Sequence, residues 1–221
     1  NFLDKQNIFY EHQYGFRQKY STSLAIIQLV HQISTAIDNK ELSAGIFLDL
    51  SKAFDTVNHV ILLNKLEHYG VRGTALGWIK NYLYNRKQFV EFNNVSSNMC
   101  IINCGIPQGS ILGPLLFILY INDISNSSKL LKFVLFADDT NIFYSSCNLD
   151  KLGTTLNNEL GKVSQWLIAN RLSINIKKTK YVIFRPRQKK INHNLMIKIN
   201  NEQIDCVHSI KFLGVILDQN L

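Results

Sequence analysis

The stretch LKFVLFADDTNIFYSS (131–146) decides the fold, because it joins a strongly apolar pattern to two adjacent acidic residues. Apolar residues fill both arms and ADDT lies between them, so the stretch predicts two strands joined by a tight turn. Asp138 and Asp139 would then lie at the turn of an apolar hairpin. They are either ordinary turn residues or part of a site that compensates their charge, because an unpaired carboxylate is costly to remove from water.

A second apolar stretch, AGIFLDL (44–50), predicts a short, mostly buried strand that carries Asp49. Taken alone, Asp49 can be a strand-end cap. If this strand pairs beside the hairpin, three carboxylates converge, and they cannot all stay ionised without cations. Magnesium suits a few carboxylates combined with substrate phosphates, and two such ions about 3.5–4 Å apart serve phosphoryl transfer. The two stretches together therefore predict a two-metal site.

The remaining segments alternate between helical and strand-like patterns, which predicts a mixed α/β or α+β domain. Helices are predicted from Ser21 or Ser23 to Asn39 and over 59–69, 74–85, 110–124 and 149–170. Strands are predicted at QFVEF (88–92), CIINC (100–104), KYVIF (180–184), LMIKI (195–199) and KFLGVIL (211–217), with a turn at Asn200 and Asn201.

Composition limits the class of protein. Of the 221 residues, 46% are hydrophobic and 18% are charged, which excludes a disordered chain. A net charge of +8 and a sequence pI of about 9.3 favour a polyanionic partner. The longest apolar run, 111–121, contains Gly113 and Pro114 and is too short to cross a bilayer.

Other features of the sequence exclude further classes. The four cysteines lack the spacing of a zinc site, so we expect reduced thiols in an intracellular protein. No Ser-His-Asp arrangement or Walker loop is present. The sequence begins without methionine, and we expect it to be a piece of a longer polypeptide.

Six motifs resemble the reverse transcriptases of non-LTR retrotransposons, particularly those of jockey-like elements. In chain order they are QYGFR (13–17), FLDLSKAFD (47–55), GIPQGSILGPLLF (105–117), FADD (136–139), LSINIKKTK (172–180) and FLGV (212–215). FADD alone is a weak signal, but six blocks in this order cover nearly the whole chain. The resemblance implies an α+β polymerase palm, an antiparallel sheet backed by helices, over about 44–221. It also implies part of the fingers in about 1–43.

The same resemblance implies an RNA-directed DNA polymerase. Such an enzyme adds dNTPs to the 3′-hydroxyl of a DNA primer along an RNA template, with two Mg²⁺ ions for which Mn²⁺ can substitute. It implies an intracellular protein of the cytoplasm and nucleus, with reverse transcription at a nuclear DNA target, and no membrane partner. The oligomeric state stays open.

Candidate site residues follow from the resemblance position by position. Asp49, Asp138 and Asp139 match the catalytic, metal-binding carboxylates, and the backbone carbonyl of Leu50 is a further expected ligand. Phe54 matches the bulky side chain beneath the sugar of the incoming nucleotide, where it would exclude a 2′-hydroxyl. The other matches are Gln108 and Gly109 at the new base pair, Lys178 near the triphosphate, and Phe212, Leu213 and Gly214 in a primer-grip hairpin.

Basic residues are the candidates for contact with the phosphate backbones of template and primer. They are Arg17 and the tract RPRQKK (185–190), which contains Arg185 and Arg187. The tract can instead be a solvated face, and Lys178 can belong to a solvated loop in which Lys177 and Lys180 compete for its role. Likewise, Phe54 and FLGV can be ordinary core, and PQGS a simple turn.

Three other functions remain open at this stage. An RNA-dependent RNA polymerase shares the palm, but Phe54 leaves no room for the 2′-hydroxyl of a ribonucleotide. A catalytically silent nucleic-acid-binding relic of an element is the second, and a group II intron maturase is the third. Compared with a complete enzyme of the family, we expect this sequence to lack the upstream fingers segment and the thumb.

Overall fold

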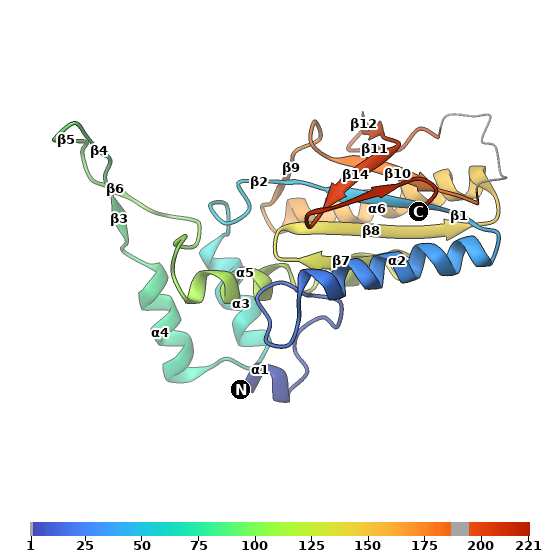
Figure 1. Cartoon of the computed structure of the whole chain (residues 1–221). Helices are drawn as coiled ribbons and strands as arrows, with labels where there is room; N and C mark the ends of the chain where they lie inside the picture. Colours follow the sequence, from blue (N-terminus) through green and yellow to red (C-terminus); the bar gives the residue numbers. More distant parts are fainter. Residues whose placement is uncertain (1, 187–194) are drawn as a thin grey trace.

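A five-stranded sheet forms the centre of the computed structural model, which describes residues 2–186 and 195–221 (Figure 1). The strand order is β13 (Asp205–Cys206), β10 (Lys180–Phe184), β1 (Leu42–Leu48), β8 (Asp139–Ser146) and β7 (Lys132–Phe136). Neighbouring strands are antiparallel except for β10 and β13. The strand that leads to Asp49 therefore pairs directly with the hairpin that carries the other two acidic residues.

Side chains alternate between two buried faces along β1, as the pleat of a strand requires. Ile46 and Leu48 join an apolar cluster with α3 (His59–His68), α5 (Leu112–Ile121) and α6 (Leu149–Ala169). Phe47 joins the opposite cluster, which contains α2 (Thr22–Asp38) and the hairpin of β14 (Ser209–Phe212) and β15 (Val215–Asp218). Apolar layers thus cover both faces, and the α+β fold class is confirmed.

Helix α2 begins and ends where the sequence predicts. Ser21 caps its first turn by accepting a hydrogen bond from the backbone N–H of Leu24, and Asn39 caps its end. Helical spacing predicts one apolar face from Ile26, Val30, Ile33 and Ile37; Ile33 is buried as predicted, and the rest of the buried face lies one position earlier. The buried residues are Ala25, Leu29, Gln32, Ile33 and Ala36, whereas Ile26, Val30 and Ile37 are half-buried.

The other predicted helices are confirmed, with α4 at Gly73–Leu83 between α3 and α5. Helical spacing predicts one apolar face of α6, and all five residues of that face are buried: Leu152, Leu156, Leu160, Val163 and Leu167. Among the described residues, two short helices were not predicted, α1 (Phe2–Lys5) and the 3₁₀ helix η1 (Ile124–Ser127).

The segments predicted as strands QFVEF and CIINC form less structure than expected. They contribute only short ladders: β3 (Lys87–Gln88) with β6 (Cys100–Ile101), and β4 (Glu91–Phe92) with β5 (Val95–Ser96). Figure 1 shows these ladders in an arm that projects from the body beyond α4. The strands of this arm are exposed on both sides.

The end of the chain also differs from the prediction. KFLGVIL bends into the β14–β15 hairpin instead of forming one strand, because Leu213 and Gly214 take φ of 48° and 91°. Only the last two residues of LMIKI form a strand, β11 (Lys198–Ile199), which pairs with β12 (Glu202–Gln203). The turn predicted at Asn200 and Asn201 joins these two strands.

Two expectations about the whole chain can be compared with the described residues. No helix among them is long and apolar enough to cross a membrane. All four cysteines are exposed and none forms a disulfide.

A buried carboxylate ties α6 to the segment before β7. Glu159 on α6 is 5% exposed and accepts hydrogen bonds from Ser128 Oγ and Lys162 Nζ, both at 2.6 Å. Ser128 Oγ in turn accepts the backbone N–H groups of Leu130 and Leu131 at 3.1 Å. The bonds from Lys162 and Ser128 lower the pKa of Glu159.

We predict that Glu159→Gln lowers the free energy of unfolding at pH 7 by about 1–3 kcal/mol, because hydrogen bonds to an ionised group are lost. The depressed pKa stabilises the folded state above the ordinary value of 4.5, and this contribution is lost as the pH falls below it. The difference between wild type and variant should therefore shrink below pH 4.5 in urea titrations. Glu67→Gln, at an exposed position of α3, is the control. Equal stabilities at pH 7 would contradict the prediction.

Candidate active site at the end of strand β1

The antiparallel register brings the three aspartates to one end of the sheet. Along β1 and β8, Phe47 lies opposite Asn141 and Leu48 opposite Thr140. Extending this register by one residue places Asp49 opposite Asp139. In a pleated sheet both side chains then belong to the face of Phe47. Asp49 is half-buried, whereas Asp138 and Asp139 are exposed.

Hydrogen bonds from a distant segment fix the backbone of Asp49. Its N–H donates to Thr179 Oγ1 at 3.2 Å, and its carbonyl accepts from the N–H of Asn175 at 2.8 Å. Thr179 is fully buried and also donates to the carbonyl of Asn175. Sequence reasoning missed both residues, although they lie inside the quoted motif LSINIKKTK, because its lysines drew the functional interpretation.

The turn between β7 and β8 contains two residues, Ala137 and Asp138, closed by the pairing of Phe136 with Asp139. Ala137 is buried and takes φ of 56°, in the left-handed region that residues with a side chain seldom adopt. The ADDT turn is confirmed, and Asp139 is the first residue of β8.

The carboxylates repel one another. Although its side chain reaches solvent, the carboxyl of Asp139 is closely surrounded by protein, and this desolvation raises its pKa. The negative charges of Asp138 and then of Asp49 raise the pKa of Asp139 further. The predicted convergence of three charges is therefore present in the structure.

The carboxylate oxygens of the three aspartates are ligands that suit a hard divalent cation such as Mg²⁺, but they do not by themselves form a complete metal site. Within residues 2–186 and 195–221, no three acidic, histidine or cysteine side chains are close enough to hold a metal by themselves. Mg²⁺ does not need such a cage, because it usually binds one or two carboxylates and completes its shell with waters and phosphates. Leu50, the further expected ligand, lies in β2 (Leu50–Ser51), which pairs with β9 (Ser173–Ile174).

Phe54 lies on the turn that follows β2 and is half-buried. Its ring stacks on the buried ring of Phe117 in α5, with centroids 4.3 Å apart. Its carbonyl accepts the N–H of Ile106 at 2.9 Å, which joins this turn to the loop that precedes α5. Phe117 therefore fixes the position of the Phe54 ring. The role of Phe54 in excluding a 2′-hydroxyl stays a prediction.

The PQGS loop lies against the same turn. Gln108 Nε2 donates to Asp55 Oδ1 at 2.8 Å, and Gly109 takes φ of 76° with open space around it. Gly105 packs so closely that a Cβ there would lie 2.7 Å from the carbonyl oxygen of Asp55. The structure thus brings Gln108 and Phe54 to one place, as the motifs predict.

A cleft of 780 Å³ opens beside Gln108 and Asp55, between this loop and the base of the arm. The cations that line it are Lys52, Arg86 and Lys87. These three residues were not predicted, because Lys52 lies far from Arg86 and Lys87 in the sequence and only the fold brings it to them.

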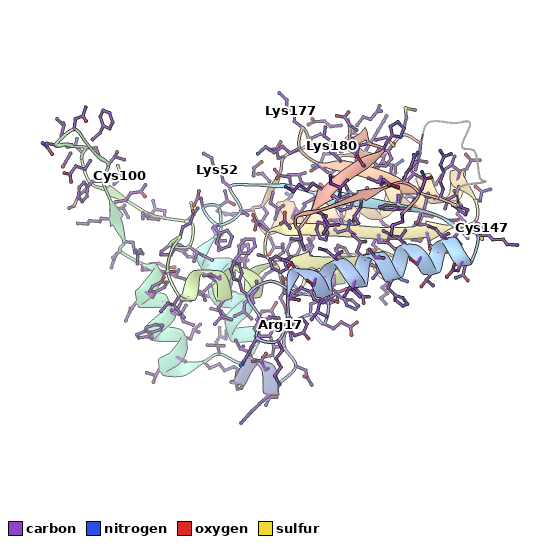
Figure 2. The ribbon with its side chains drawn as sticks, viewed as in Figure 1. Arg17, Lys52, Cys100, Cys147, Lys177 and Lys180 are labelled. Carbon is purple, nitrogen blue, oxygen red and sulfur yellow. The ribbon has the colours of Figure 1, made fainter. Side chains whose placement is uncertain are left out.

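The lysines of the LSINIKKTK motif differ in their surroundings (Figure 2). Lys180 forms an ion pair with Asp205, whereas Lys177 and Lys178 are exposed. The structure therefore leaves Lys177 and Lys178 as alternatives for the predicted contact with a triphosphate.

The basic residues predicted to contact template and primer differ in how far they are engaged inside the protein. The guanidinium of Arg17 donates to the carbonyls of Tyr10 and Gln13 and lies over the ring of Tyr20, so it is engaged inside the protein. Arg185 is half-buried beside the end of the β14–β15 hairpin, and its backbone N–H donates to Gln219. Arg187, with residues 188–190 of the basic tract, lies outside the described residues.

The FLGV segment forms a hairpin tip, as its resemblance to a primer grip implies. Phe212 is 5% exposed and packs edge-on against Phe47 of β1, so its ring belongs to the core. Leu213 and Gly214 form the turn and are more exposed. Any contact of this hairpin with nucleic acid would therefore come from the tip.

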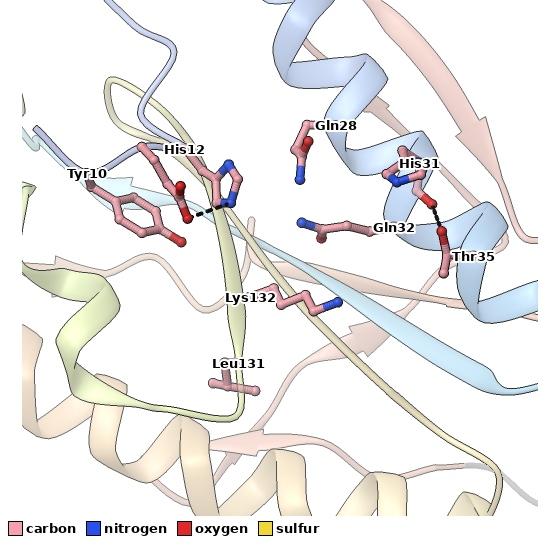
Figure 3. A pocket seen from close by; sticks show the side chains of 9 residues that line it. Tyr10, His12, Gln28, His31, Gln32, Thr35, Leu131 and Lys132 are labelled. Carbon is pink, nitrogen blue, oxygen red and sulfur yellow. Dashed lines mark hydrogen bonds and ion pairs between the residues drawn. The ribbon is translucent and has the colours of Figure 1, made fainter. Parts of the chain in front are cut away.

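A second hollow, a groove of 390 Å³, lies between α2, the segment 10–12 and the start of β7 (Figure 3). Polar side chains line it, among them His12, Gln28, Gln32 and Lys132. His12 pairs with Glu11 at 3.3 Å. None of the three aspartates lines this groove.

An antiparallel sheet backed by helices, with three carboxylates at the end of its central strands, defines a polymerase palm. The model of the family described as "Reverse transcriptase (RNA-dependent DNA polymerase)" matches residues 1–217, so the chain belongs to this family.

Similar curated proteins include polymerases from mobile elements of Drosophila. The probable RNA-directed DNA polymerase from transposon X-element of Drosophila melanogaster is 31% identical over 99% of this chain and 24% of its own length. The RNA-directed DNA polymerase from mobile element jockey of Drosophila funebris is 29% identical over 95% of this chain and 23% of its own length. The chain thus spans about a quarter of the length of these relatives.

Solved structures share the fold at low sequence identity. Telomerase from Candida albicans, solved with a fragment of telomeric RNA, covers 98% of this chain with a TM-score of 0.64 and 15% identity, over 35% of its own chain. Apo telomerase from Candida tropicalis, truncated from its C-terminal domain, gives a TM-score of 0.66 at 13% identity and covers 98% of this chain and 42% of its own. These likenesses support the palm architecture.

We predict that Asp139→Asn raises the free energy of unfolding of the metal-free chain at pH 7, because it removes a carboxylate that is desolvated and lies near the negative charges of Asp138 and Asp49. The folded pKa of Asp139 lies above its ordinary value of 3.8, so its ionised form destabilises the folded state above that folded pKa. The advantage of the variant should shrink as the pH falls toward 3.8. Urea titrations with a chelator at several pH values measure it, with Glu91→Gln on the exposed arm as the control. A variant no more stable than wild type at pH 7 would show that neither desolvation nor repulsion of the Asp139 carboxylate destabilises the folded chain.

Proposed function

We propose that this chain is the catalytic palm of a non-LTR retrotransposon's RNA-directed DNA polymerase. It would add dNTPs to the 3′-hydroxyl of a DNA primer along an RNA template. The observation that carries this proposal is the convergence of Asp49, Asp138 and Asp139 in a chain that matches the reverse transcriptase family over residues 1–217.

The carboxylates are the residues that would hold divalent metal ions, as reverse transcriptases generally require. Asp49 and Asp139 face each other across two strands, and Asp138 lies on the exposed turn beside them. Two bound Mg²⁺ ions would supply the positive charge that phosphoryl transfer requires at the attacking and departing oxygens. Mn²⁺ would substitute for Mg²⁺ with the same oxygen ligands.

The other side chains of the site would position substrates. Phe54, fixed by Phe117 from below, would lie beneath the sugar of the incoming nucleotide and exclude a 2′-hydroxyl. Gln108 can exchange its bond to Asp55 for one to the nucleotide or the template base. Lys178 or Lys177 would approach the triphosphate, and the tip at Leu213 and Gly214 would support the primer.

The division of the chain belongs to the same proposal. Residues of about 1–43 would be the part next to the fingers and about 44–221 the palm. The polymerase would work inside the cell, with reverse transcription at a nuclear DNA target.

One alternative function is that of a family member that binds nucleic acid but no longer catalyses DNA synthesis. A silent nucleic-acid-binding relic would be expected to lose its costly carboxylates, yet all three are intact and their surroundings are in order. An RNA polymerase would need space for the 2′-hydroxyl at Phe54. Catalysis of DNA synthesis is therefore the function that the site supports best.

We predict that Asp49→Ala and Asp138→Ala each abolish primer extension, lowering its rate by about 100-fold or more, because each removes a metal ligand. The measurement is extension of a DNA primer on an RNA template with Mg²⁺, in the extended polypeptide, meaning residues 1–221 together with their flanking sequence. Asp38→Ala, at the exposed end of α2, is the control. Extension at more than a few per cent of the wild-type rate by either variant would contradict the two-metal assignment.

We predict that Phe54→Val raises the ratio of ribonucleotide to deoxyribonucleotide incorporation by about tenfold or more, because a smaller side chain opens space at the sugar. The ratio is measured as kcat/KM for rNTP over kcat/KM for dNTP in the extended polypeptide. Phe143→Val, in the buried core of β8, controls for general loosening of the fold. An unchanged ratio for Phe54→Val would assign Phe54 to packing alone.

A further inference from the structure

The QYGFR segment lies against the turn that carries two of the aspartates. The N–H of Tyr14 donates to the carbonyl of Leu135 at 2.8 Å, and the N–H of Leu135 donates to the carbonyl of His12 at 2.9 Å. Gln13 and Leu135 therefore form a parallel bridge at β7, the last strand of the sheet. The segment therefore lies along the edge of β7 opposite to β8, and from there it reaches the turn.

Gln13 connects this segment to the turn through its side chain. The residue is fully buried, and its Oε1 accepts the N–H of Gly15 at 2.8 Å and the N–H of Ala137 at 3.2 Å. Ala137 is the residue held at φ of 56°. A side-chain acceptor for its N–H therefore stabilises the very conformation that the backbone disfavours.

Packing alone does not account for a glutamine at this position. Among the described residues, Gln13 Nε2 has no hydrogen-bond partner, and burying an unpaired amide N–H costs free energy. An apolar side chain of the same length would fill the space without that cost. The advantage of the amide lies in the two N–H groups that its oxygen accepts.

Gly15 sets how closely the segment approaches. A Cβ at this position would lie 2.4 Å from the backbone nitrogen of Ala137 and 2.9 Å from the carbonyl carbon of Phe136, so only glycine fits. The guanidinium of Arg17 also donates a hydrogen bond to the carbonyl of Gln13 at 3.2 Å, which helps to fix the backbone of the QYGFR segment. The segment thus presses directly on the residues that precede Asp138.

We propose that Gln13 and Gly15 are positioning residues, which hold the Ala137–Asp138 turn so that the carboxylates of Asp138 and Asp139 are directed at the site shared with Asp49. This inference rests on the proposed function. Ala137 adjoins Asp138 in the chain, so a change in its φ swings both carboxylates away from Asp49. The motif QYGFR therefore serves the metal site through the backbone, without touching the substrate.

Gln13→Met tests this role, because it keeps the length of the side chain and removes the acceptor. In the 221-residue chain, Mn²⁺ binding is measured by electron paramagnetic resonance, and exchange of the Ala137 amide proton by NMR. In the extended polypeptide, kcat and KM for dNTP are measured with Mg²⁺. We expect the Mn²⁺ dissociation constant to rise, and kcat to fall, by about tenfold or more, as when groups that orient metal ligands are removed. The KM for dNTP should change little.

Two variants serve as matched controls. Gln32→Met replaces another buried glutamine, which lines the groove beside α2 and whose Oε1 also has no partner among the described residues (Figure 3). Gly161→Ala adds a Cβ on α6 where no atom lies within 4 Å, in contrast to Gly15→Ala. Both controls should leave Mn²⁺ affinity and kcat unchanged, whereas Gly15→Ala should resemble Gln13→Met.

A Gln13→Met protein that folds and keeps both its Mn²⁺ affinity and its kcat overturns the inference. So does a variant that only melts earlier, since that result assigns Gln13 to stability alone. Should Gln13→Met fail to fold, Gln13→Asn carries the test, because its shorter amide stays polar but cannot reach Ala137. Failure of the proposed function looks different: wild type and Asp139→Asn would bind Mn²⁺ equally, and the inference would fall with it.

Discussion

Mutual repulsion among Asp49, Asp138 and Asp139 is the constraint on which the rest of the structure depends. Among the ion pairs of the described residues, none involves these three carboxylates. Their positions are set by neutral groups that bind the backbone: Thr179 and Asn175 at Asp49, and Gln13 at Ala137. A lysine or arginine in the same place would neutralise the charge and compete with an incoming cation. Neutral supports leave the negative charge available.

The sheet provides the rigidity that such an arrangement needs. Strand β1 is buried along its whole length and pairs with β8 and β10 on either side. Covered by apolar clusters on both faces, it fixes the position of the residue that follows it. Asp138 lies on an exposed turn, where water lowers the cost of its charge, whereas Asp139 begins the neighbouring strand β8. The buried strand β1 fixes the position of Asp49, and the exposed turn keeps Asp138 in contact with water. Together these features allow the three carboxylates to lie close to one another.

Periodicity and turn chemistry predicted most of the fold, because these signals are local. The helices at 21–39 and 149–170 and the 131–146 hairpin are confirmed, and so is the pairing that brings Asp49 to the hairpin. The single strand expected at KFLGVIL was wrong, because two residues with positive φ, the first of them not glycine, bend it into a hairpin. The strands expected between α4 and α5 were overestimated, because β-propensity needs a packed face to act on.

The candidate site was only partly predictable, because its supports lie far from its carboxylates in the sequence. Acidic residues in apolar stretches are conspicuous, so Asp49, Asp138 and Asp139 could be found from the residues alone. Asn175 and Gln13 act through hydrogen bonds to residues more than 100 positions away, and no local pattern reveals such bonds.

For Arg17 a local signal was visible but incomplete. Its positive charge predicted contact with nucleic acid, whereas in the structure its guanidinium donates hydrogen bonds to carbonyls inside the protein. Four separated segments, 12–15, 42–49, 132–139 and 175–179, therefore have to assemble before the carboxylates are in place. It follows that the three carboxylates come together only when the whole sheet has folded, and that FADD by itself cannot bring them together.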